Sequence, residues 1–536
     1  MTRPPSTANR QIARAAGTVM FAIVVGQLAG LARGIIVANA FGASITLDAF
    51  YAANRVSETL FLLVAGGALG SAFIPTFTGL LAKDDQDSAW RLAFSLAHAV
   101  TLTLSLLAAL IAWFAPQVVR YALAPGFSAD PATFALTVSL LRIQLISAVL
   151  FGLGGLIVGV LNAHQVFLIP ALTPAMYQLG IIFGALFLAP FMGIYGLAWG
   201  VVIGAVLYLL IQLPSLAQLI TNHLLPTSRF WSLNLKDPHV RQVLTLMLPR
   251  LLGVAVVQLN FWVNTNLASR MEAGSVASLT YGFSLMLMAQ AAIAQSVAIA
   301  AMPTFSAQHA LGKTDEMRSS LAASLRGVLL LAFPASAGLM ILRQPLISLL
   351  YQRGEFDQRA VEMVAWALLW YAAGLVGHSI MEVLTRAFYA QQDTKTPVVI
   401  GTIAMGLNVV FSVGFSRLFA QIGWYPLGGL ALANSLATAL EAAALFFFMR
   451  RRLGGIEGKS IADGAWRVGL STLGMAIGLG VWIQVTGSLN RWLVALGGVA
   501  LGAVLYGMGV VILQIPEIKT VLHAIMRRLP RRATSS

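Results

Sequence analysis

Long apolar segments separated by short polar ones dominate this chain. Residues 143–228 contain no Asp, Glu, Lys or Arg, and neither do residues 468–490 or 492–515. A helix needs about 20 apolar residues to cross the hydrocarbon core of a bilayer, so the first of these segments alone has room for several spans. The pattern predicts an all-α polytopic membrane protein.

Pro, Gly and charge clusters divide the apolar sequence into about fourteen predicted membrane-spanning helices. Their approximate ranges are 15–40, 47–80, 91–115, 132–162, 166–189, 193–220, 240–268, 275–307, 319–350, 359–390, 396–417, 427–449, 465–486 and 492–515. The first of them resembles a signal peptide, because basic residues precede an apolar stretch. Arg33 interrupts that stretch and many spans follow, so we expect a retained first span rather than a cleaved leader.

The composition agrees with a membrane protein and indicates its topology. Of the 536 residues, 58% are apolar and 10% are charged, against about 45–50% and about 25% in soluble domains. The formal net charge of +15 alone could suggest nucleic-acid binding. With the N-terminus inside, however, 23 of the 34 Lys and Arg residues fall in cytoplasmic segments and seven in outer ones, as the positive-inside rule requires. We therefore expect both termini in the cytoplasm and no nucleic-acid partner.

Three short matches at nearly one spacing indicate an internal repeat. The matches are Pro-Thr-Phe at 75–77 and 303–305, phenylalanine at 127 and 356, and proline at 170 and 397. Their offsets are 228, 229 and 227 residues. Two six-helix copies follow, and the even number of spans gives both copies the same orientation. Parallel repeats are a transporter architecture with the substrate site at the repeat interface.

The repeat predicts three parts of the chain. Residues 1–225 form an N-terminal six-helix lobe and residues 226–455 form a C-terminal one. Residues 456–536 contain two additional spans and a basic cytoplasmic tail. The additional pair lies outside the repeat and needs a separate explanation.

The sequence contains no recognisable catalytic or cofactor motif. The glycine-rich segment 454–460 lacks the first glycine of a phosphate-binding loop, and no α/β domain surrounds it. The seven histidines lack metal-ligand spacing and cysteine is absent. The sequence also has no Gly-x-Ser-x-Gly nucleophile elbow. We therefore predict a transporter without cofactor or metal, not an enzyme.

Charged residues inside the predicted spans are the candidate functional residues, because each costs at least about 2.5–3.5 kcal/mol on insertion scales unless it has a partner or a wet cavity. Arg55 and Glu58 are three residues apart on one helix face, and Glu382 and Arg386 are four apart. Each pair can be a self-neutralised structural pair or a gating or coupling group. The other charges in spans are Asp48, Arg142 and Glu441.

Arg33 and Arg250 have no acid three or four residues away, and each lies in the first helix of its repeat copy. We expect both to line a central cavity that attracts a phosphate or carboxylate. Arginine suits this task because its planar guanidinium binds such anions through two parallel hydrogen bonds.

Several segments of the chain resemble signatures of the MurJ (MviN) family, bacterial flippases of the peptidoglycan precursor lipid II. They are residues 30–33, 41–43, 48–50, 124–127, 162–171, 350–356 and, as the most specific, 388–397. The resemblance extends over nearly the whole chain. It implies two six-helix lobes around a cationic cavity, and a groove for the polyprenyl tail on the additional pair of helices. In the last segment it singles out Tyr389, Asp393, Lys395, Thr396 and Pro397.

The resemblance implies that the chain moves lipid II across the bacterial cytoplasmic membrane by alternating access. Arg33, with Arg250 and Arg55, would hold the pyrophosphate, and Asp48 and Glu58 complete the candidate substrate-binding set. Glu382 and Arg386 are gating or coupling candidates. Coupling would be to the membrane potential or to a monovalent cation.

The chain departs from the family's charge pattern at positions that bear on its cargo. Gln27, Phe61, Leu62 and Ser284 stand where family arginines align, and Gly34 and Gly66 stand where acids align. The cargo could therefore be another polyprenyl-linked glycan or an amphiphile. A third reading is a transport-inactive scaffold that recruits cell-wall enzymes.

Overall fold

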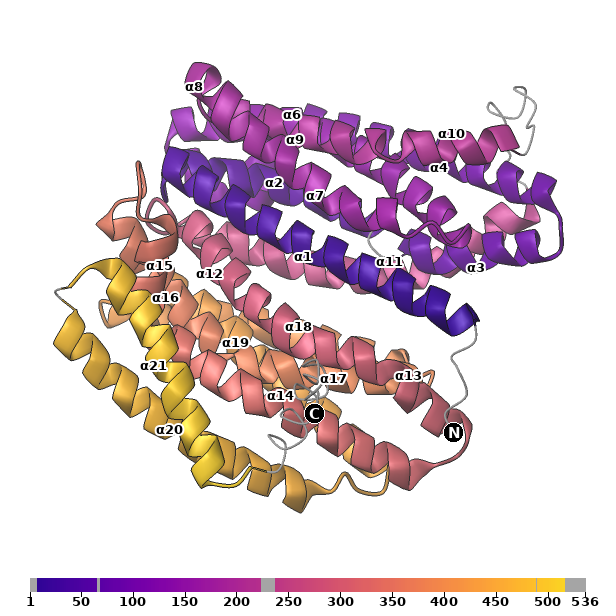
Figure 1. The fold of residues 1–536 in the computed structure, drawn as a ribbon. Helices are drawn as coiled ribbons and strands as arrows, with labels where there is room; N and C mark the ends of the chain where they lie inside the picture. The colour runs from indigo at the N-terminus through magenta and orange to yellow at the C-terminus, as the bar shows by residue number, and fades with distance from the viewer. Residues whose placement is uncertain (1–6, 65–67, 223–236, 488, 516–536) are drawn as a thin grey trace, which may run out of the picture. The chain divides into compact units, whose positions relative to one another are not determined.

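The computed structural model describes residues 7–64, 68–222, 237–487 and 489–515, and all regular secondary structure in these ranges is helical (Figure 1). The predicted all-α fold is confirmed. The α-helices are α1 (Thr7–Phe41), α2 (Ile45–Val64), α3 (Ala68–Ala82), α4 (Gln86–Trp113), α5 (Ala115–Gln117), α6 (Pro131–Ala163), α7 (Leu168–Phe183), α8 (Ala189–Met192), α9 (Ile194–Leu210), α10 (Leu213–Asn222), α11 (Pro238–Ala268), α12 (Ser275–Gln290), α13 (Ser296–Ala310), α14 (Thr314–Ile341), α15 (Arg343–Tyr351), α16 (Gln358–Ala373), α17 (Leu375–Ala390), α18 (Lys395–Gln421), α19 (Leu427–Arg452), α20 (Gly458–Thr486) and α21 (Arg491–Ile512). Short π-helical turns are η1 (Val118–Leu123), η3 (Gly184–Leu188) and η5 (Ala291–Gln295), and η2 (Pro125–Ala129) is a 3₁₀ turn.

The number of spans is smaller by helix length and hydropathy than the sequence predicts. In the described residues, 11 helices are long and apolar enough to cross a membrane, or up to 12 if α16 and α17, bent by 46°, form one span. The predicted count of fourteen is not confirmed by this criterion. One reason is α2, whose 20 residues contain three charged side chains. Another is α3, which is only 15 residues long.

The contacts divide the chain into two compact units. Unit 1 comprises Met1–Ala277 and Arg353–Asp357, and unit 2 comprises Ser278–Gln352 and Gln358–Ser536. In unit 1, α2 packs on α6, α1 on α7, and α11 on both α2 and α3. In unit 2, α19 packs on α16, α17 and α18, and α20 packs on α14 and α21. The predicted lobe boundaries at residues 225 and 455 follow the repeat and stay a prediction.

The two repeat copies share local backbone geometry at the matched positions. Gln165 and Gln392, which are 227 residues apart, both have left-handed backbone angles, with φ of 61° and 60°. In each turn the glutamine N–H donates to the carbonyl three residues earlier, that of Asn162 or Tyr389. Non-glycine residues seldom adopt a positive φ, so its recurrence at this offset supports the predicted repeat.

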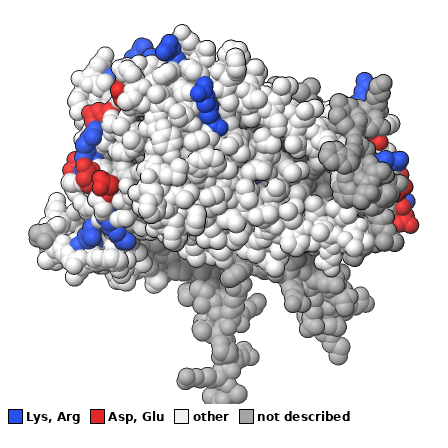
Figure 2. All heavy atoms as spheres, turned by 90° about the horizontal axis from the view of Figure 1, so that it is seen from above, with Lys and Arg blue, Asp and Glu red and all other residues white. Residues whose placement is uncertain are grey.

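Apolar side chains cover much of the exposed surface. Leu106, Phe187, Ile403, Ile477 and Val504 are examples of large hydrophobic residues that are more than half exposed. On the face shown in Figure 2, charged side chains gather near the two ends and the surface between them is largely uncharged. An apolar belt of this kind suits contact with lipid hydrocarbon.

Candidate functional site

A polar cluster within unit 1 forms beside the contact of α1 with α7 and includes side chains from α2. Arg33 extends from α1, Asn54 and Glu58 extend from α2, and Tyr177 extends from α7. The Tyr177 hydroxyl lies near the Asn54 side chain and within electrostatic range of Arg33 and Glu58. The structure thus brings together two of the predicted site residues, Arg33 and Glu58. Sequence reasoning missed Tyr177, because Thr173 and Gln178 are also polar residues of α7 and no local signal sets Tyr177 apart.

Arg33 is the unneutralised charge of this cluster. Its side chain is half-buried, and within the described ranges no hydrogen bond or ion pair satisfies its guanidinium. Because a charged group in a membrane span needs a partner or water, an unpaired arginine beside Tyr177 is suited to bind an anion that enters from outside the protein.

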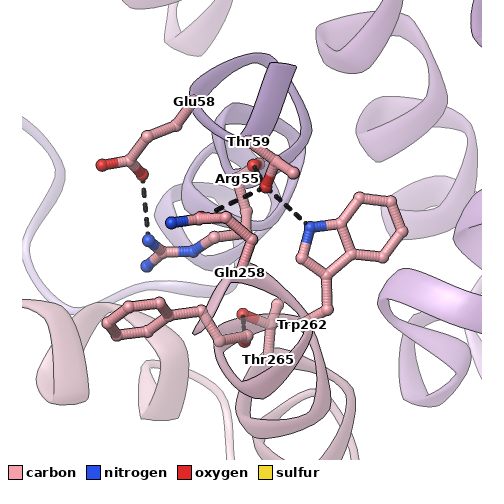
Figure 3. Close-up of polar contacts among 7 residues, drawn as sticks. Arg55, Glu58, Thr59, Gln258, Trp262 and Thr265 are labelled. Atoms are coloured by element: carbon pink, nitrogen blue, oxygen red, sulfur yellow. Dashed lines mark hydrogen bonds and ion pairs between the residues drawn. The ribbon is translucent and has the colours of Figure 1, made fainter. Parts of the chain in front are cut away.

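Arg55 differs from Arg33 because the protein itself satisfies its charge. Its Nη1 lies 2.9 Å from Oε2 of Glu58. Its guanidinium also lies over the ring of Phe261 from α11, 4.9 Å from the ring centroid. Figure 3 shows the pair beside α11. The structural reading of the 55/58 pair is therefore the better supported one, and a direct role of Arg55 in substrate binding stays a prediction.

A hydrogen-bonded contact between α2 and α11 fixes the position of this pair (Figure 3). Trp262 Nε1 donates to Thr59 Oγ1 at 2.9 Å, and Thr59 Oγ1 donates to the carbonyl of Arg55 at 2.7 Å. Gln258 Oε1 lies 3.4 Å from the same hydroxyl. The contact links residues about 200 positions apart, which no local sequence pattern could have indicated.

Asp48 has a different environment from the arginines. It is 1% exposed. Its Oδ2 accepts the backbone N–H of Gly274 and its Oδ1 accepts that of Ala277, both at 2.7 Å. A carboxylate at the start of a helix satisfies backbone N–H groups and the positive end of the helix dipole. In this state Asp48 is a cap for the first turn of α12, and its predicted part in substrate binding has no support from these contacts.

Close backbone contacts between turns of unit 1 lie near Asp48. Glu355 N–H donates to the carbonyl of Asn39 at 3.0 Å. Gly42 has a φ of 61°, and a Cβ added there would lie 2.3 Å from the Glu355 carbonyl oxygen. Gly354 has a φ of 53°, and a Cβ added there would lie 2.3 Å from the Asn39 carbonyl oxygen. Only glycine permits this approach of the two turns.

Two of the positions named from the sequence have side chains or residues that the structure does not describe. Arg250 belongs to α11 by its backbone, but its side chain is not described. Gly66 falls in the range 65–67, which is also not described. The role of Arg250 in anion binding stays a prediction.

The gating candidates in unit 2 form the ion pair that their spacing predicts. Arg386 Nη2 lies 3.1 Å from Glu382 Oε1, on adjacent turns of α17. Tyr389 follows on the same helix, within electrostatic range of both residues and of Glu441 on α19. The sequence predicted the Glu382–Arg386 pair, but it did not indicate that Tyr389 lies near both this pair and Glu441.

The signature loop that follows α17 ties three helices together. Asp393 Oδ1 accepts the Thr396 backbone N–H at 3.0 Å and its Oδ2 accepts the Thr396 hydroxyl at 2.7 Å. Arg452, the last residue of α19, donates to the same carboxylate. Desolvation opposes the shift, but these hydrogen bonds and the Arg452 charge lower the pKa of Asp393 to about 2. Lys395 is exposed and Pro397 is buried. The contacts of Asp393 give the loop a structural role in joining the ends of these helices.

The additional pair α20 and α21 lies side by side in unit 2 (Figure 1). Leu342 of unit 2 packs with Met475 and Leu479 of α20 in a small buried cluster. Trp466 on α20 and Trp492 on α21 are at least half exposed. The pair therefore has a buried side and an exposed apolar side, as a helix pair bordering lipid should have.

No metal site is formed by the described residues, in which no group of three or more His, Cys, Asp or Glu side chains could hold an ion. The chemistry available in the described part of the site is hydrogen bonding and charge.

Comparison with known proteins gives consistent results. The family model for "Lipid II flippase MurJ" matches residues 37–496. A curated protein from Burkholderia cenocepacia, named lipid II flippase MurJ, is 34% identical over 441 residues, which cover 82% of this chain and 84% of the relative. A probable lipid II flippase MurJ from Vibrio cholerae is 31% identical over 453 residues, covering 82% and 83%.

Solved structures show the same fold. A structure of lipid II flippase MurJ in an inward closed conformation superposes with a TM-score of 0.78 at 24% identity and covers 93% of this chain and 99% of that one. An inward-facing multidrug transporter of the MATE family, in the MOP superfamily, superposes with a TM-score of 0.67 at 16% identity and covers 80% and 94%.

Proposed function

Since this chain belongs to the lipid II flippase MurJ family, we propose that it moves lipid II from the inner to the outer leaflet of the bacterial cytoplasmic membrane by alternating access, with Arg33 as the group that binds the pyrophosphate. The protein is a transporter and not an enzyme. A flippase has to solve one physical problem: the polar disaccharide-peptide headgroup cannot cross hydrocarbon with its hydrogen-bonding groups unsatisfied.

The role of Arg33 is supported by its position beside a polar cluster without a partner among the described residues. A pyrophosphate supplies the acceptor oxygens that a guanidinium binds through two parallel hydrogen bonds. Tyr177 and Asn54 add neutral polar groups next to Arg33. Arg250 and Arg55 would reinforce the positive potential, and the polyprenyl tail would stay in lipid along α20 and α21.

The turns around Gly42 and Gly354 support the alternation. In the predicted topology they lie at the outer ends of the spans. We propose that release of these contacts and of the Asp48 cap accompanies opening toward the outer leaflet. A Gly42→Ala variant would then favour the open state, because its methyl group meets the Glu355 carbonyl.

The matched control for that variant is Gly26→Ala, where an added Cβ has nothing within 4 Å. We expect Gly42→Ala to increase labelling, from the outside, of a cysteine placed below the turns, and Gly26→Ala to leave it unchanged. Because the chain has no cysteine, a single introduced one reports without background. Equal labelling of both variants would contradict the proposed gate.

We also propose that both termini face the cytoplasm, supported by the bias of Lys and Arg toward those segments. Single cysteines at Ser6 and Ser535 tested with an impermeant thiol reagent on intact cells would decide this. Protection at both positions agrees with the proposal, and labelling at either one contradicts it.

A second cargo, another polyprenyl-linked glycan, is favoured by one observation. Phe61, at a position where family arginines align, packs in an aromatic cluster with Phe151 and Tyr208, with ring centroids 5.0 Å and 6.4 Å away. An arginine's charge is thus replaced by apolar packing, which weakens the positive potential available to the headgroup.

The experiment that separates the two cargoes is translocation of labelled lipid II in proteoliposomes with unlabelled competitors. Lipid II should be transported and should compete with itself more strongly than a polyprenyl-pyrophosphate carrying a different glycan. Absence of lipid II transport, with transport of the second glycolipid, would favour the alternative. Arg142→Ala is a matched arginine control, since Arg142 is exposed and donates to the Ala112 carbonyl at 3.1 Å.

A further inference from the structure

A buried polar stripe runs along α19 in unit 2. Asn434, Thr438 and Glu441 are spaced four and three residues apart, which places them on one helix face. All three are more than nine-tenths buried. At the outer end of the stripe, Nε2 of His378 on α17 lies 3.1 Å from Oδ1 of Asn434.

Glu441 is the one member of this stripe that carries an ionisable carboxyl group, and the described parts of the protein offer it no partner. It is 8% exposed, and neither a hydrogen bond nor an ion pair reaches it from a described residue. On the α18 side it faces Gly401, where an added Cβ would lie 3.1 Å from Glu441 Oε1. Glycine thus leaves room next to the carboxyl group.

The charged groups of the neighbouring helices do not neutralise Glu441. On α17, Glu382 and Arg386 pair with each other, and the nearby Tyr389 is neutral in its ordinary form. On α18, the charged residues are Lys395 in the first turn and Arg417 in the last two turns.

The third helix packed on α19 is α16. None of its titratable residues forms a hydrogen bond or ion pair with Glu441 in the described parts of the protein. Its charged residues, Arg359 and Glu362, lie in the first two turns, and Tyr371 follows in the last turn. Within the described residues, burial and the absence of a counter-charge therefore set the state of Glu441.

An ionised carboxylate that is buried in a membrane span without a counter-charge is costly, whereas the neutral acid costs far less. A hard metal cation requires several oxygen ligands at once, and the described residues provide no group of three acidic or histidine ligands. A lone carboxyl group needs only one proton to become neutral.

We propose that Glu441 is a proton-binding site in unit 2 and that the proton it takes up is the coupling ion of the transport cycle. This inference rests on the proposed flippase function. One carboxylate oxygen forms an O–H bond with a proton delivered by water, and the same bond breaks when the proton returns to water on the other side. Nothing is oxidised or reduced.

The coupling follows from a difference between two states. Protonation favours the state described here, in which Glu441 is buried, and release of the proton favours a state in which water reaches the carboxylate. A proton gradient would thereby bias the alternation between the two. The Asn434 and Thr438 side chains extend polar groups from Glu441 toward His378 as a path for water.

The test uses the full chain, purified and reconstituted in proteoliposomes, and compares wild type with Glu441→Gln. We expect an imposed pH gradient to change wild-type lipid II transport at least fivefold and to change Glu441→Gln transport less than twofold. Glu316→Gln is the matched control, since Glu316 is exposed and pairs with Lys313 at 2.8 Å, and its response should equal that of wild type.

A second measurement does not depend on the cargo. Infrared difference spectra of the purified protein at two pH values should contain a carboxylic-acid carbonyl band that is lost in Glu441→Gln and shifted in Gly401→Ala, which adds a methyl group beside Oε1. The shift keeps the proposal testable if Glu441→Gln fails to fold.

The outcomes separate this inference from the proposed function. If wild type transports lipid II but the gradient has no effect, or Glu441→Gln responds like wild type, the coupling role of Glu441 is wrong and the flippase stands. If wild type transports no lipid II but the infrared band depends on Glu441, the site stands as a proton-binding group and the proposed cargo is wrong. A band that is unchanged in both variants overturns the site.

Discussion

Each unit of the protein contains an intramembrane group that has no partner among the described residues, and the two groups have opposite chemistry. In unit 1 it is the guanidinium of Arg33, half-buried beside Tyr177. In unit 2 it is the carboxyl group of Glu441, buried beside Gly401. Each unit also contains a local ion pair, formed by Arg55 with Glu58 and by Glu382 with Arg386.

This comparison separates two kinds of charge within one membrane protein. A paired charge is satisfied by the fold, so its removal should act chiefly on stability. A charge without a partner among the described residues has to be satisfied by something else, for which we propose an anion at Arg33 and a proton at Glu441. On this proposal, pairing distinguishes structural from functional charges better than position in a span does.

The largest effect on stability should come from Asp48. Its carboxyl group pairs with no basic side chain among the described residues but accepts two backbone N–H groups. Asp48→Ala removes two charge-assisted hydrogen bonds to backbone N–H groups and leaves both N–H groups buried. We expect the free energy of unfolding to fall by about 3 kcal/mol. Thermal unfolding in detergent would measure this.

Asp48→Asn is the companion variant, because its side-chain oxygen can still accept one of the two N–H groups. It should lose about half as much stability. If both variants unfolded like wild type but lost transport, Asp48 would belong with Arg33 among the functional charges, and pairing would not be the property that sorts them.

A smaller effect on stability is expected from the α2–α11 contact that positions the Arg55–Glu58 ion pair. Trp262→Phe removes the hydrogen bond to Thr59 but keeps most of the aromatic volume. The expected loss is about 1 kcal/mol, with transport reduced less than threefold. Transport that disappears in a stably folded Trp262→Phe protein would show that the α2–α11 contact has a direct part in function.

An effect of similar size should come from Asp393 in unit 2, but it should decrease at low pH. The pKa of Asp393 is lower in the folded protein, about 2, than its ordinary value of 3.8. Its contribution to stability is therefore present above about pH 4 and is lost as the pH falls toward 2. Asp393→Asn should cost about 1 kcal/mol at pH 7, and the difference from wild type should vanish near pH 2. If Asp393→Asn were still less stable than wild type near pH 2, the loss would come from packing and not from the charge of Asp393.

Much of this architecture follows from the sequence alone. Apolar periodicity indicates the helices, and the repeat offsets lead to the turns at Gln165 and Gln392, whose left-handed backbone recurs. Local spacing also predicts the pairs 55/58 and 382/386. The helices, the repeated turns and the two ion pairs depend on residues close in sequence or on a constant repeat offset. The sequence alone can therefore predict them.

What the sequence could not indicate depends on distant residues. The backbone partners of Asp48 lie 226 and 229 positions away, so its sequence context marks it only as a charge in a span. Tyr177 and Trp262 are similar, since nothing local distinguishes them from lipid-facing aromatic residues. The length and hydropathy test does not confirm the exact count of fourteen spans, because α2 is too charged and α3 too short to pass it, and because the predicted span 359–390 is divided between α16 and α17.

Whether Arg33 binds the cargo can be tested by lipid II translocation in proteoliposomes with Arg33→Ala and Arg55→Ala, measured beside the unfolding temperature of each variant. We expect Arg33→Ala to lose at least tenfold in transport rate at an unchanged unfolding temperature. We expect Arg55→Ala to lose less than threefold, with a lower unfolding temperature. Equal transport by Arg33→Ala and wild type, or a greater loss in Arg55→Ala than in Arg33→Ala, would contradict the claim that the unpaired arginine binds the cargo.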